Sequence, residues 1–126
     1  MLPTLADGDR VLMNKNLGEL KRGDIVNFLY PKDKSKQYIK RIVGLPNEKI
    51  EIHNGTVFIN DSEIEEPYVD QNLNQSKQNT RAQIIPENQY FVLGDNRDNS
   101  SDSRAWGTLQ KELIVGKYYL AYAKAK

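Results

Sequence analysis

The 126-residue sequence predicts an all-β protein, a barrel or a sandwich of short strands with short helical turns. Two observations carry this prediction. Short runs rich in β-branched and aromatic residues recur along the chain, and Gly, Pro and Asn separate them. The only helix-like segment is short, at 108–113. A chain of this length is expected to form one domain, residues 1–126, with a modest core.

Each strand is predicted from local signals. In chain order, the expected strands are 9–13, 24–30, 37–43, 49–52, 56–59, 89–93 and 115–122. The Asn54-Gly55 pair is the strongest hairpin signal, because both central residues of a type I′ turn need positive φ. The stretch 70–83 is rich in Asn, Gln, Ser and Lys, and predicts a solvated excursion over about 70–85.

Composition excludes several classes of function. Lys and Arg total 18 and Asp and Glu total 17, so a net charge of +1 gives no electrostatic argument for nucleic acid. The sequence has no cysteine, hence neither disulfides nor a thiolate metal site. Its single histidine, His53, is expected in solvent beside the Asn-Gly turn. No run approaches about 18 apolar residues, so none of these residues is predicted to span a bilayer.

A lysine in an apolar strand is the first candidate for chemistry. Strand alternation places Tyr38, Lys40 and Ile42 on one face and Arg41 on the other. A lysine between Tyr and Ile is expected to lose solvent, which lowers its pKa and lets it act as a general base. From the strand alone, the more common alternative is that Lys40 reaches the surface or pairs with an acid.

The polar segment Gly94–Arg104 is the second candidate. It is either an ordinary turn or a loop whose three aspartates and two arginines pair with one another and fix its shape. A calcium loop built on Asp95, Asp98 and Asp102 is rejected, because the spacing does not fit an EF-hand and interleaved arginines repel a cation. No metal is therefore expected. The acidic cluster Glu63–Glu66 is expected to be a solvated face.

Three segments together carry a resemblance to a known family. They are Met1-Leu-Pro-Thr-Leu5 followed by Asp7-Gly8-Asp9, Tyr38–Pro46, and Gly94–Arg104 followed by Ala105-Trp106-Gly107. In this order they resemble the conserved boxes of bacterial type I signal peptidases, from residue 1 to about residue 116. The resemblance implies a closed or partly closed β-barrel. It also implies a membrane-anchored serine endopeptidase that needs no cofactor and removes signal peptides from exported preproteins on the outer face of the cytoplasmic membrane.

The resemblance also implies roles for individual residues. Lys40 aligns with the general base of a Ser/Lys dyad, and Ser100 with the serine that orients it. Asp102 and Arg104 correspond to a supporting ion pair, and Asp95 and Arg41 are further supporting residues. The positions that line the pockets for small substrate side chains, of the Ala-x-Ala type, correspond to Met1, Leu5, Tyr38 and Ile39; core packing is the alternative for these four.

The sequence departs from the family pattern in two places. The family motif is Ser-Met-x-Pro-Thr-Leu and Met1 is its Met, so the nucleophilic serine and the lipid-embedded anchor are expected before Met1, and the 126-residue chain by itself is expected to be inactive. Asn47-Glu48 replaces Gly-Asp, and Asn tolerates the left-handed conformation. The alternatives are an inactive homologue, a self-cleaving repressor-type Ser/Lys peptidase, or a β module that binds extended peptides without cleavage.

Overall fold

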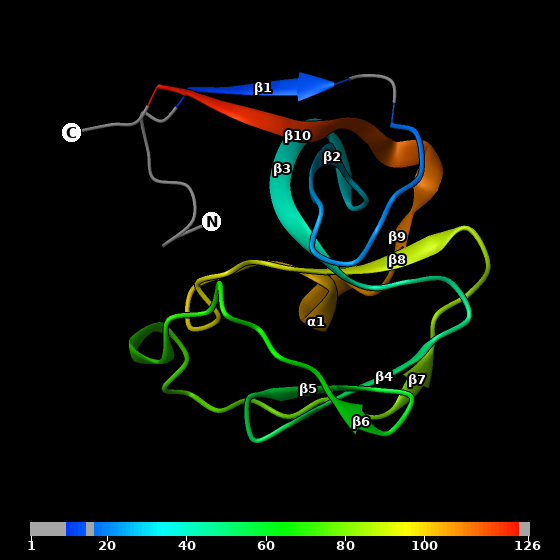
Figure 1. The fold of residues 1–126 in the computed structure, drawn as a ribbon. Coiled ribbons are helices and arrows are strands. Elements are labelled where there is room, and N and C mark those ends of the chain that lie inside the picture. Colours follow the sequence, from blue (N-terminus) through cyan, green and yellow to red (C-terminus); the bar gives the residue numbers. More distant parts are fainter. Residues whose placement is uncertain (1–9, 15–16, 124–126) are drawn as a thin grey trace.

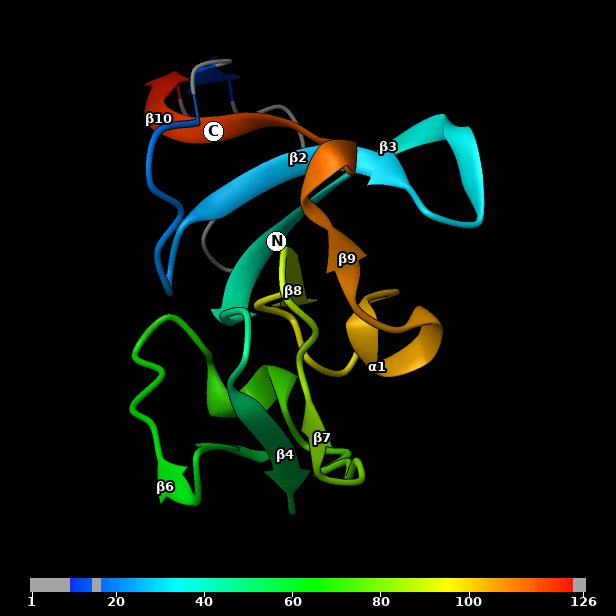
Figure 2. The ribbon, with the colours of Figure 1, turned by 90° about the vertical axis from the view of Figure 1, so that its right-hand side faces the viewer.

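Two antiparallel sheets form the protein. The computed structural model describes residues 10–14 and 17–123. The larger sheet has the strand order β1-β10-β2-β3-β8-β9 and the smaller one the order β6-β5-β4-β7. Figures 1 and 2 show the smaller sheet below the larger one. The all-β prediction is confirmed, and within the described residues neither sheet closes on itself, which matches the partly closed alternative.

All seven predicted strands are present, and three two-residue strands, at 62–63, 83–84 and 109–110, were not predicted. The strands are β1 (Arg10–Asn14), β2 (Ile25–Tyr30), β3 (Asp33–Gly44), β4 (Lys49–His53), β5 (Thr56–Ile59), β6 (Ser62–Glu63), β7 (Gln83–Ile84), β8 (Gln89–Leu93), β9 (Leu109–Gln110) and β10 (Ile114–Ala123). The predicted Asn-Gly hairpin joins β4 to β5, with φ of 50° at Asn54 and 79° at Gly55. Asn47 also lies in the left-handed region, with φ of 68°.

The predicted helical segment is only partly helical. Residues 108–113 contain the short strand β9 and one 3-10 turn, η2 (Lys111–Leu113). A second 3-10 turn, η1, spans Gln71–Leu73, and an α-helical turn, α1, spans Ser103–Trp106. Sequence periodicity missed α1 because one turn is too short to show a repeat. The turn α1 forms because Asp102 caps its N-terminus: the Asp102 carboxylate accepts the backbone N–H of Arg104.

The paired strands β3 and β8 separate two apolar clusters. Successive residues of a strand face opposite sides, so Ile42 packs in one cluster and Val43 in the other. Val92 and Phe91 of β8 divide in the same way. The buried members of the clusters are Leu20, Val26, Phe28, Ile42, Tyr90, Val92, Leu109, Leu113 and Ile114 on one side, and Val43, Ile50, Ile52, Val57, Ile59, Ile85, Phe91 and Leu93 on the other. This double packing fixes the two strands that carry the candidate site.

The polar stretch after residue 70 is largely exposed but tied to the smaller sheet. The Thr80 N–H donates to the Ile52 carbonyl, and the Gly55 N–H donates to the Gln78 carbonyl. Asn74 is buried, and its amide donates to the Gly55 carbonyl at 3.1 Å. The composition of this segment predicts a solvated excursion, but hydrogen bonds to the smaller sheet and its hairpin turn hold the segment in place.

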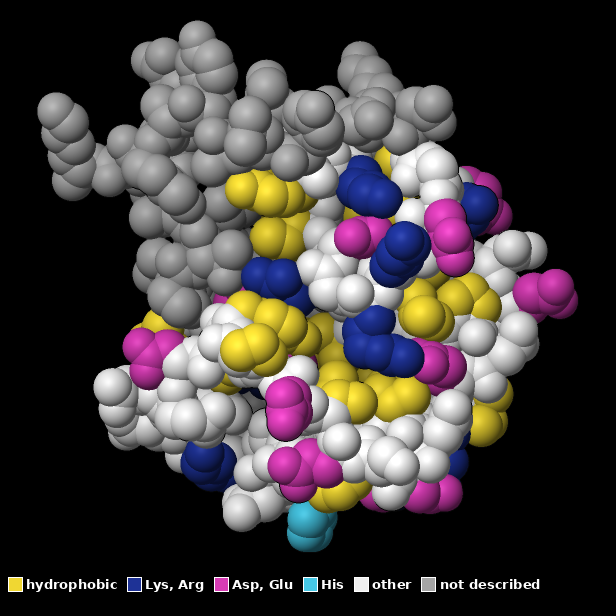
Figure 3. Space-filling model, in the orientation of Figure 1, with side chains coloured by type: hydrophobic (Ala, Val, Ile, Leu, Met, Phe, Trp, Pro, Cys, Tyr) yellow, Lys and Arg dark blue, Asp and Glu magenta, His cyan; other side chains and the backbone are white. Residues whose placement is uncertain are grey.

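One face of the protein carries charges of both signs (Figure 3). Basic and acidic side chains are interspersed over the face shown in Figure 3. His53 is exposed at the end of β4, as expected. Over residues 10–14 and 17–123, no helix has both the length and the apolar character that a bilayer crossing requires.

Candidate functional site

Lys40 lies near the middle of β3, on the face that it shares with Tyr38. Its Nζ donates a hydrogen bond to Ser100 Oγ at 2.9 Å and lies 5.7 Å from the centre of the Tyr38 ring. Burial lowers the pKa of Lys40, the nearby Asp102 carboxylate opposes that shift, and the Arg104 charge adds to it. Within the described residues, no carboxylate forms an ion pair with the Lys40 amine.

Gly94 makes the meeting of Lys40 and Ser100 possible. A Cβ on Gly94 would collide with Ser100 Oγ and would lie 3.4 Å from Lys40 Nζ. Only glycine leaves enough space for both groups at this position, because it has no side chain. Gly94 lies in a segment that was predicted to carry chemistry, but its own role was not predicted. Its signal was a glycine placed directly between an apolar strand and a polar segment.

Asp102 and Arg104 form an ion pair beside these residues. Arg104 donates through Nε and Nη2 to the two carboxylate oxygens of Asp102, each at 2.9 Å. Asp102 is fully buried and also accepts the Gly94 N–H at 3.1 Å. One carboxylate therefore caps α1, pairs with Arg104 and fixes the backbone of Gly94.

Arg41 and Asp95 form a second ion pair on the opposite side of β3. Arg41 Nε and Nη2 donate to the Asp95 carboxylate at 2.9 and 2.8 Å, and Nη1 donates to the Gly23 carbonyl at 2.9 Å. Asp95 is fully buried. The guanidinium carbon of Arg41 lies 3.9 Å from the centre of the Tyr68 ring, which gives a close cation–π contact.

The expectation that charges within Gly94–Arg104 pair with one another is only partly correct. Among the described residues, Asp102 with Arg104 is the one such pair. Asp95 instead pairs with Arg41 of β3, and Asp98 accepts the backbone N–H groups of Gln75 and Ser76 at 2.8 and 2.9 Å. The segment is thus shaped by partners distant in sequence.

The expectation of a solvated acidic face over Glu63–Glu66 is wrong for Glu66. Its side chain is 10% exposed, and its carboxylate binds Arg97, with 2.6 Å between Arg97 Nη2 and Glu66 Oε2. Arg97 is itself buried, so an acid must compensate its charge. Glu66, Tyr68 and Arg97 were all missed as site residues. No local signal pairs Arg97 with Glu66, because Asp95 and Asp98 are nearer acids in the sequence.

An open hollow of about 390 Å³ adjoins Lys40. It is lined by Gln37, Tyr38, Ile39, Lys40 and Ser101. Ile39 is 36% exposed, whereas Tyr38 is half-buried and stacks on Tyr30 with the ring centres 4.7 Å apart. Part of the Tyr38 side chain thus packs in the core, and only the rest can line a substrate pocket. The other two residues expected to line substrate pockets, Met1 and Leu5, lie outside the described residues.

Beside this hollow, part of one edge of β3 has no strand partner among the described residues. Residues 37–41 and Asp33 pair with β2, but β8 pairs with β3 at Arg41, Ile42 and Gly44. Within residues 10–14 and 17–123, no strand therefore pairs with the second edge of β3 between residues 33 and 40. An unpaired edge can accept an extended peptide by backbone hydrogen bonding.

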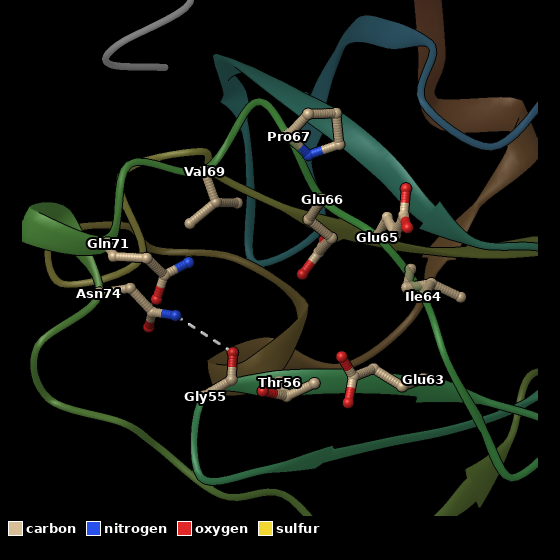
Figure 4. A pocket seen from close by; sticks show the side chains of 10 residues that line it. All are labelled: Gly55, Thr56, Glu63, Ile64, Glu65, Glu66, Pro67, Val69, Gln71 and Asn74. Carbon is tan, nitrogen blue, oxygen red and sulfur yellow. Dashed lines mark hydrogen bonds between the residues drawn. The ribbon is translucent and has the colours of Figure 1, made fainter.

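A second hollow, of about 360 Å³, lies over the smaller sheet (Figure 4). Its lining includes three acidic residues, Glu63, Glu65 and Glu66, and the buried Asn74. It includes neither Lys40 nor Ser100. Because Glu66 already binds Arg97, the wall of this hollow is continuous with the ion pairs around the candidate site.

Comparison with known proteins identifies the family. A family model described as signal peptidase, peptidase S26, matches residues 1–123. The chain belongs to the signal peptidase family. The resemblance carried by the three sequence segments is thereby confirmed, and the chain is placed among peptidases.

Individual signal peptidases support the assignment. Signal peptidase IB of Staphylococcus aureus (strain Mu50 / ATCC 700699) is 37% identical over 135 residues, which cover 93% of this chain and 70% of that protein. Signal peptidase I P of Bacillus subtilis subsp. natto is 41% identical over 127 residues, covering 92% and 68%. A crystal structure of a signal peptidase I from Enterococcus faecalis V583 matches 78% of this chain and 95% of its own, with a TM-score of 0.64 and 32% identity.

Proposed function

We propose that the full-length protein is a serine endopeptidase that removes signal peptides from exported preproteins by a Ser/Lys dyad. The observation that carries this proposal is the Lys40 amine. It has a lowered pKa, no paired carboxylate among the described residues, and a hydrogen bond of 2.9 Å to Ser100. An amine in that state can accept a proton from a hydroxyl group.

The nucleophile in this mechanism is the serine that the family motif places directly before Met1. Neutral Lys40 takes the proton of that serine while its oxygen attacks the scissile carbonyl, forming a tetrahedral oxyanion. The serine's own backbone N–H and a nearby hydroxyl hold the oxyanion. Lys40 then passes the proton to the leaving amine, and water hydrolyses the resulting ester by the same steps. Ser100 orients Lys40 throughout.

Substrate binding is proposed along the open edge of β3. An extended peptide would add to the strand beside the hollow that Tyr38 and Ile39 line. The resemblance to the family assigns Met1 and Leu5 to substrate binding as well. The same resemblance implies a preference for small residues such as Ala one and three positions before the cleaved bond. The resemblance to the family supports a membrane anchor before Met1 and a catalytic domain outside the cytoplasmic membrane.

The open strand edge favours one alternative, a module that binds extended peptides without cleaving them. This alternative needs the edge and the hollow but not the Lys40 amine. A lysine held beside a serine hydroxyl, with its pKa lowered, gives no advantage to a simple binder. Activity measurements on Lys40 variants therefore separate the two functions.

The test uses the full-length protein with its anchor, cleaving an Ala-x-Ala signal-peptide substrate. We expect cleavage by the parent, and loss of cleavage when the serine before Met1 is replaced by alanine. Lys40→Arg should also be inactive, because a guanidinium stays protonated and cannot act as a base. The 126-residue chain alone should be inactive.

Two results would contradict the mechanism. If Lys40→Arg kept its rate, another group, with Asp95 or Asp98 as candidates, would be the base. If the 126-residue chain cleaved at the parental rate, the nucleophile would lie within it. A parent that binds the peptide tightly but never cleaves it would support the binding module instead.

A further inference from the structure

The Ile64–Val69 segment connects the two halves of the candidate site, although no sequence motif marks it. Its residues Glu66 and Tyr68 contact two buried arginines. One of these, Arg97, belongs to the polar segment that carries Ser100. The other, Arg41, directly follows Lys40 in β3. The segment therefore contacts the neighbours of both members of the Lys40–Ser100 pair.

Glu66 acts on the polar segment through Arg97. The two terminal nitrogens of Arg97 donate to the two oxygens of Glu66 at 3.0 and 2.6 Å, a bidentate arrangement that fixes the guanidinium plane. The remaining nitrogen, Arg97 Nε, donates to the Gly94 carbonyl at 2.9 Å. Arg97 is 2% exposed, so solvent cannot replace Glu66 without a rearrangement. The position of the Gly94 carbonyl thus depends on Glu66.

Tyr68 acts on β3 through Arg41. The Tyr68 ring packs on the Arg41 guanidinium, and the Tyr68 hydroxyl donates to Glu66 Oε2 at 3.0 Å. Burial, and then the Glu66 carboxylate, raise the pKa of Tyr68, so this hydroxyl remains a donor over the working pH range. Arg41 in turn binds Asp95, the residue after Gly94.

These contacts close a ring. It runs from Arg41 to Asp95, along the backbone to Gly94, through Arg97 to Glu66, and back through Tyr68 to Arg41. Gly94 lies beside both groups, because an added Cβ would collide with the Ser100 side chain and would lie 3.4 Å from Lys40 Nζ. A shift of Gly94 therefore alters the distance between the Lys40 amine and the Ser100 hydroxyl.

We propose that Glu66 and Tyr68 are positioning residues of the peptidase, which hold Gly94 and β3 in the one arrangement that brings Lys40 to Ser100. This inference rests on the proposed function, in which that contact orients the base. A role in stability alone is the competing explanation. Replacing a buried ion pair by apolar residues of similar volume is often neutral for stability, so stability alone is a weak explanation for these contacts.

The test compares Glu66→Gln with Glu65→Gln in the full-length enzyme. Glu66→Gln keeps the size of the side chain but removes the charge that fixes Arg97. Glu65 is exposed, and no described residue forms an ion pair with it, so Glu65→Gln is the matched control. We expect Glu66→Gln to lower kcat by roughly 10- to 10²-fold, as a misplaced base does, with KM changed less than about twofold. Glu65→Gln should match the parent.

A double-mutant cycle distinguishes positioning from stability. If Glu66 acts through the Lys40–Ser100 contact, Glu66→Gln should cost much less kcat in a Ser100→Ala background than in the parent. All rates are measured well below each variant's unfolding midpoint. Equal losses in both backgrounds, or a lower Tm with unchanged kcat, would overturn the proposal. Tyr68→Phe, which keeps the ring on Arg41 but loses the hydroxyl, should show the same coupling with a smaller loss and serves if Glu66→Gln does not fold.

A second measurement does not depend on activity. In the isotope-labelled 126-residue chain, NMR should detect a nuclear Overhauser contact between the Lys40 side chain and the Ser100 side chain. The contact should persist in Glu65→Gln and weaken in Glu66→Gln. An inactive parent with this pattern would reject the proposed function but keep the positioning role. An unchanged contact in folded Glu66→Gln would reject the positioning role even if the enzyme is a peptidase.

Discussion

Lys40 and Arg41 are consecutive in β3, but they lie on opposite faces of the strand in different electrostatic environments. On one face, Arg41 is held by a buried carboxylate, a backbone carbonyl and an aromatic ring. On the other face, Lys40 has a hydroxyl group as its hydrogen-bond partner and forms no ion pair among the described residues. Strand alternation alone separates the two environments, since the residues are adjacent in sequence.

The difference shows how a fold can keep one amine titratable among many fixed charges. The carboxylates closest to the site each pair with an arginine: Asp95 with Arg41, and Asp102 with Arg104. Lys40 is thereby desolvated without a full counter-charge, and its pKa falls, mainly through burial. The guanidinium groups stay charged at any physiological pH and can only be structural or electrostatic.

The largest expected effect comes from replacing each cation by the same apolar residue. Lys40→Met should lower kcat/KM of the full-length enzyme by roughly 10⁴-fold or more, because the general base is lost. Its Tm should be unchanged or higher, since methionine is buried without desolvating a charge. Arg41→Met should instead lower the free energy of unfolding by about 3–5 kcal/mol, because Asp95 loses its guanidinium partner.

The difference between the two faces predicts both results: a loss of activity in Lys40→Met and a loss of stability in Arg41→Met. Activity is measured per folded molecule, and stability by denaturant unfolding of the 126-residue chain. A Lys40→Met enzyme with residual activity close to that of the parent would show that the two faces do not differ in function. An Arg41→Met chain as stable as the parent would show that the Asp95 side needs no compensation.

A smaller contrast separates two serines of the same polar segment. Ser100 contacts Lys40, whereas Ser103 Oγ accepts the buried N–H of Val92 at 2.9 Å. Ser100→Ala should lower kcat by roughly tenfold through loss of orientation, with little change in stability. Ser103→Ala should reduce the free energy of unfolding by about 1–3 kcal/mol, because a buried donor loses its acceptor, and should leave kcat nearly unchanged.

Rates and unfolding curves of both serine variants check this contrast. If Ser103→Ala lost as much kcat as Ser100→Ala, the polar segment would act as one unit, and contact with Lys40 would carry no special weight. If neither lost activity, the orienting role of Ser100 would have to be abandoned.

Local signals predicted the strands well, and the partners of the charged residues poorly. Alternation and turn residues act over a few positions, so the β4–β5 hairpin and the opposite faces of Lys40 and Arg41 could be read from the sequence. The resemblance to the family, and not a local signal, implied that Lys40 and Ser100 would meet. Ion pairs such as Arg97 with Glu66 join residues 31 positions apart, and no periodicity records that distance.

The prediction from composition was also wrong about which acidic side chains are exposed. The Glu63–Glu66 cluster has the composition of a solvated face, and Glu63 and Glu65 are indeed exposed. Only the fold of the 64–69 segment turns Glu66 toward Arg97. The short helix α1 was missed for a related reason, because a single capping carboxylate, and not a repeat, produces it.

The smallest expected effect concerns the electrostatic difference between Arg104 and Lys40. Because neutral Lys40 is the active form, kcat of the parent should rise with pH through the pKa of Lys40, which lies below its ordinary value. The Arg104 charge helps to lower that pKa, and the Asp102 carboxylate raises it. Arg104→Gln removes the first influence and leaves the second without its guanidinium partner, so the ammonium form becomes more favourable. The rising limb of the pH–rate profile should therefore move to higher pH, with a similar plateau.

Arg22→Gln, which removes a charge paired with Glu48, is the matched control and should leave the limb in place. A limb that stays fixed in Arg104→Gln, or moves to lower pH, would mean that Lys40 is not the group whose deprotonation the profile follows.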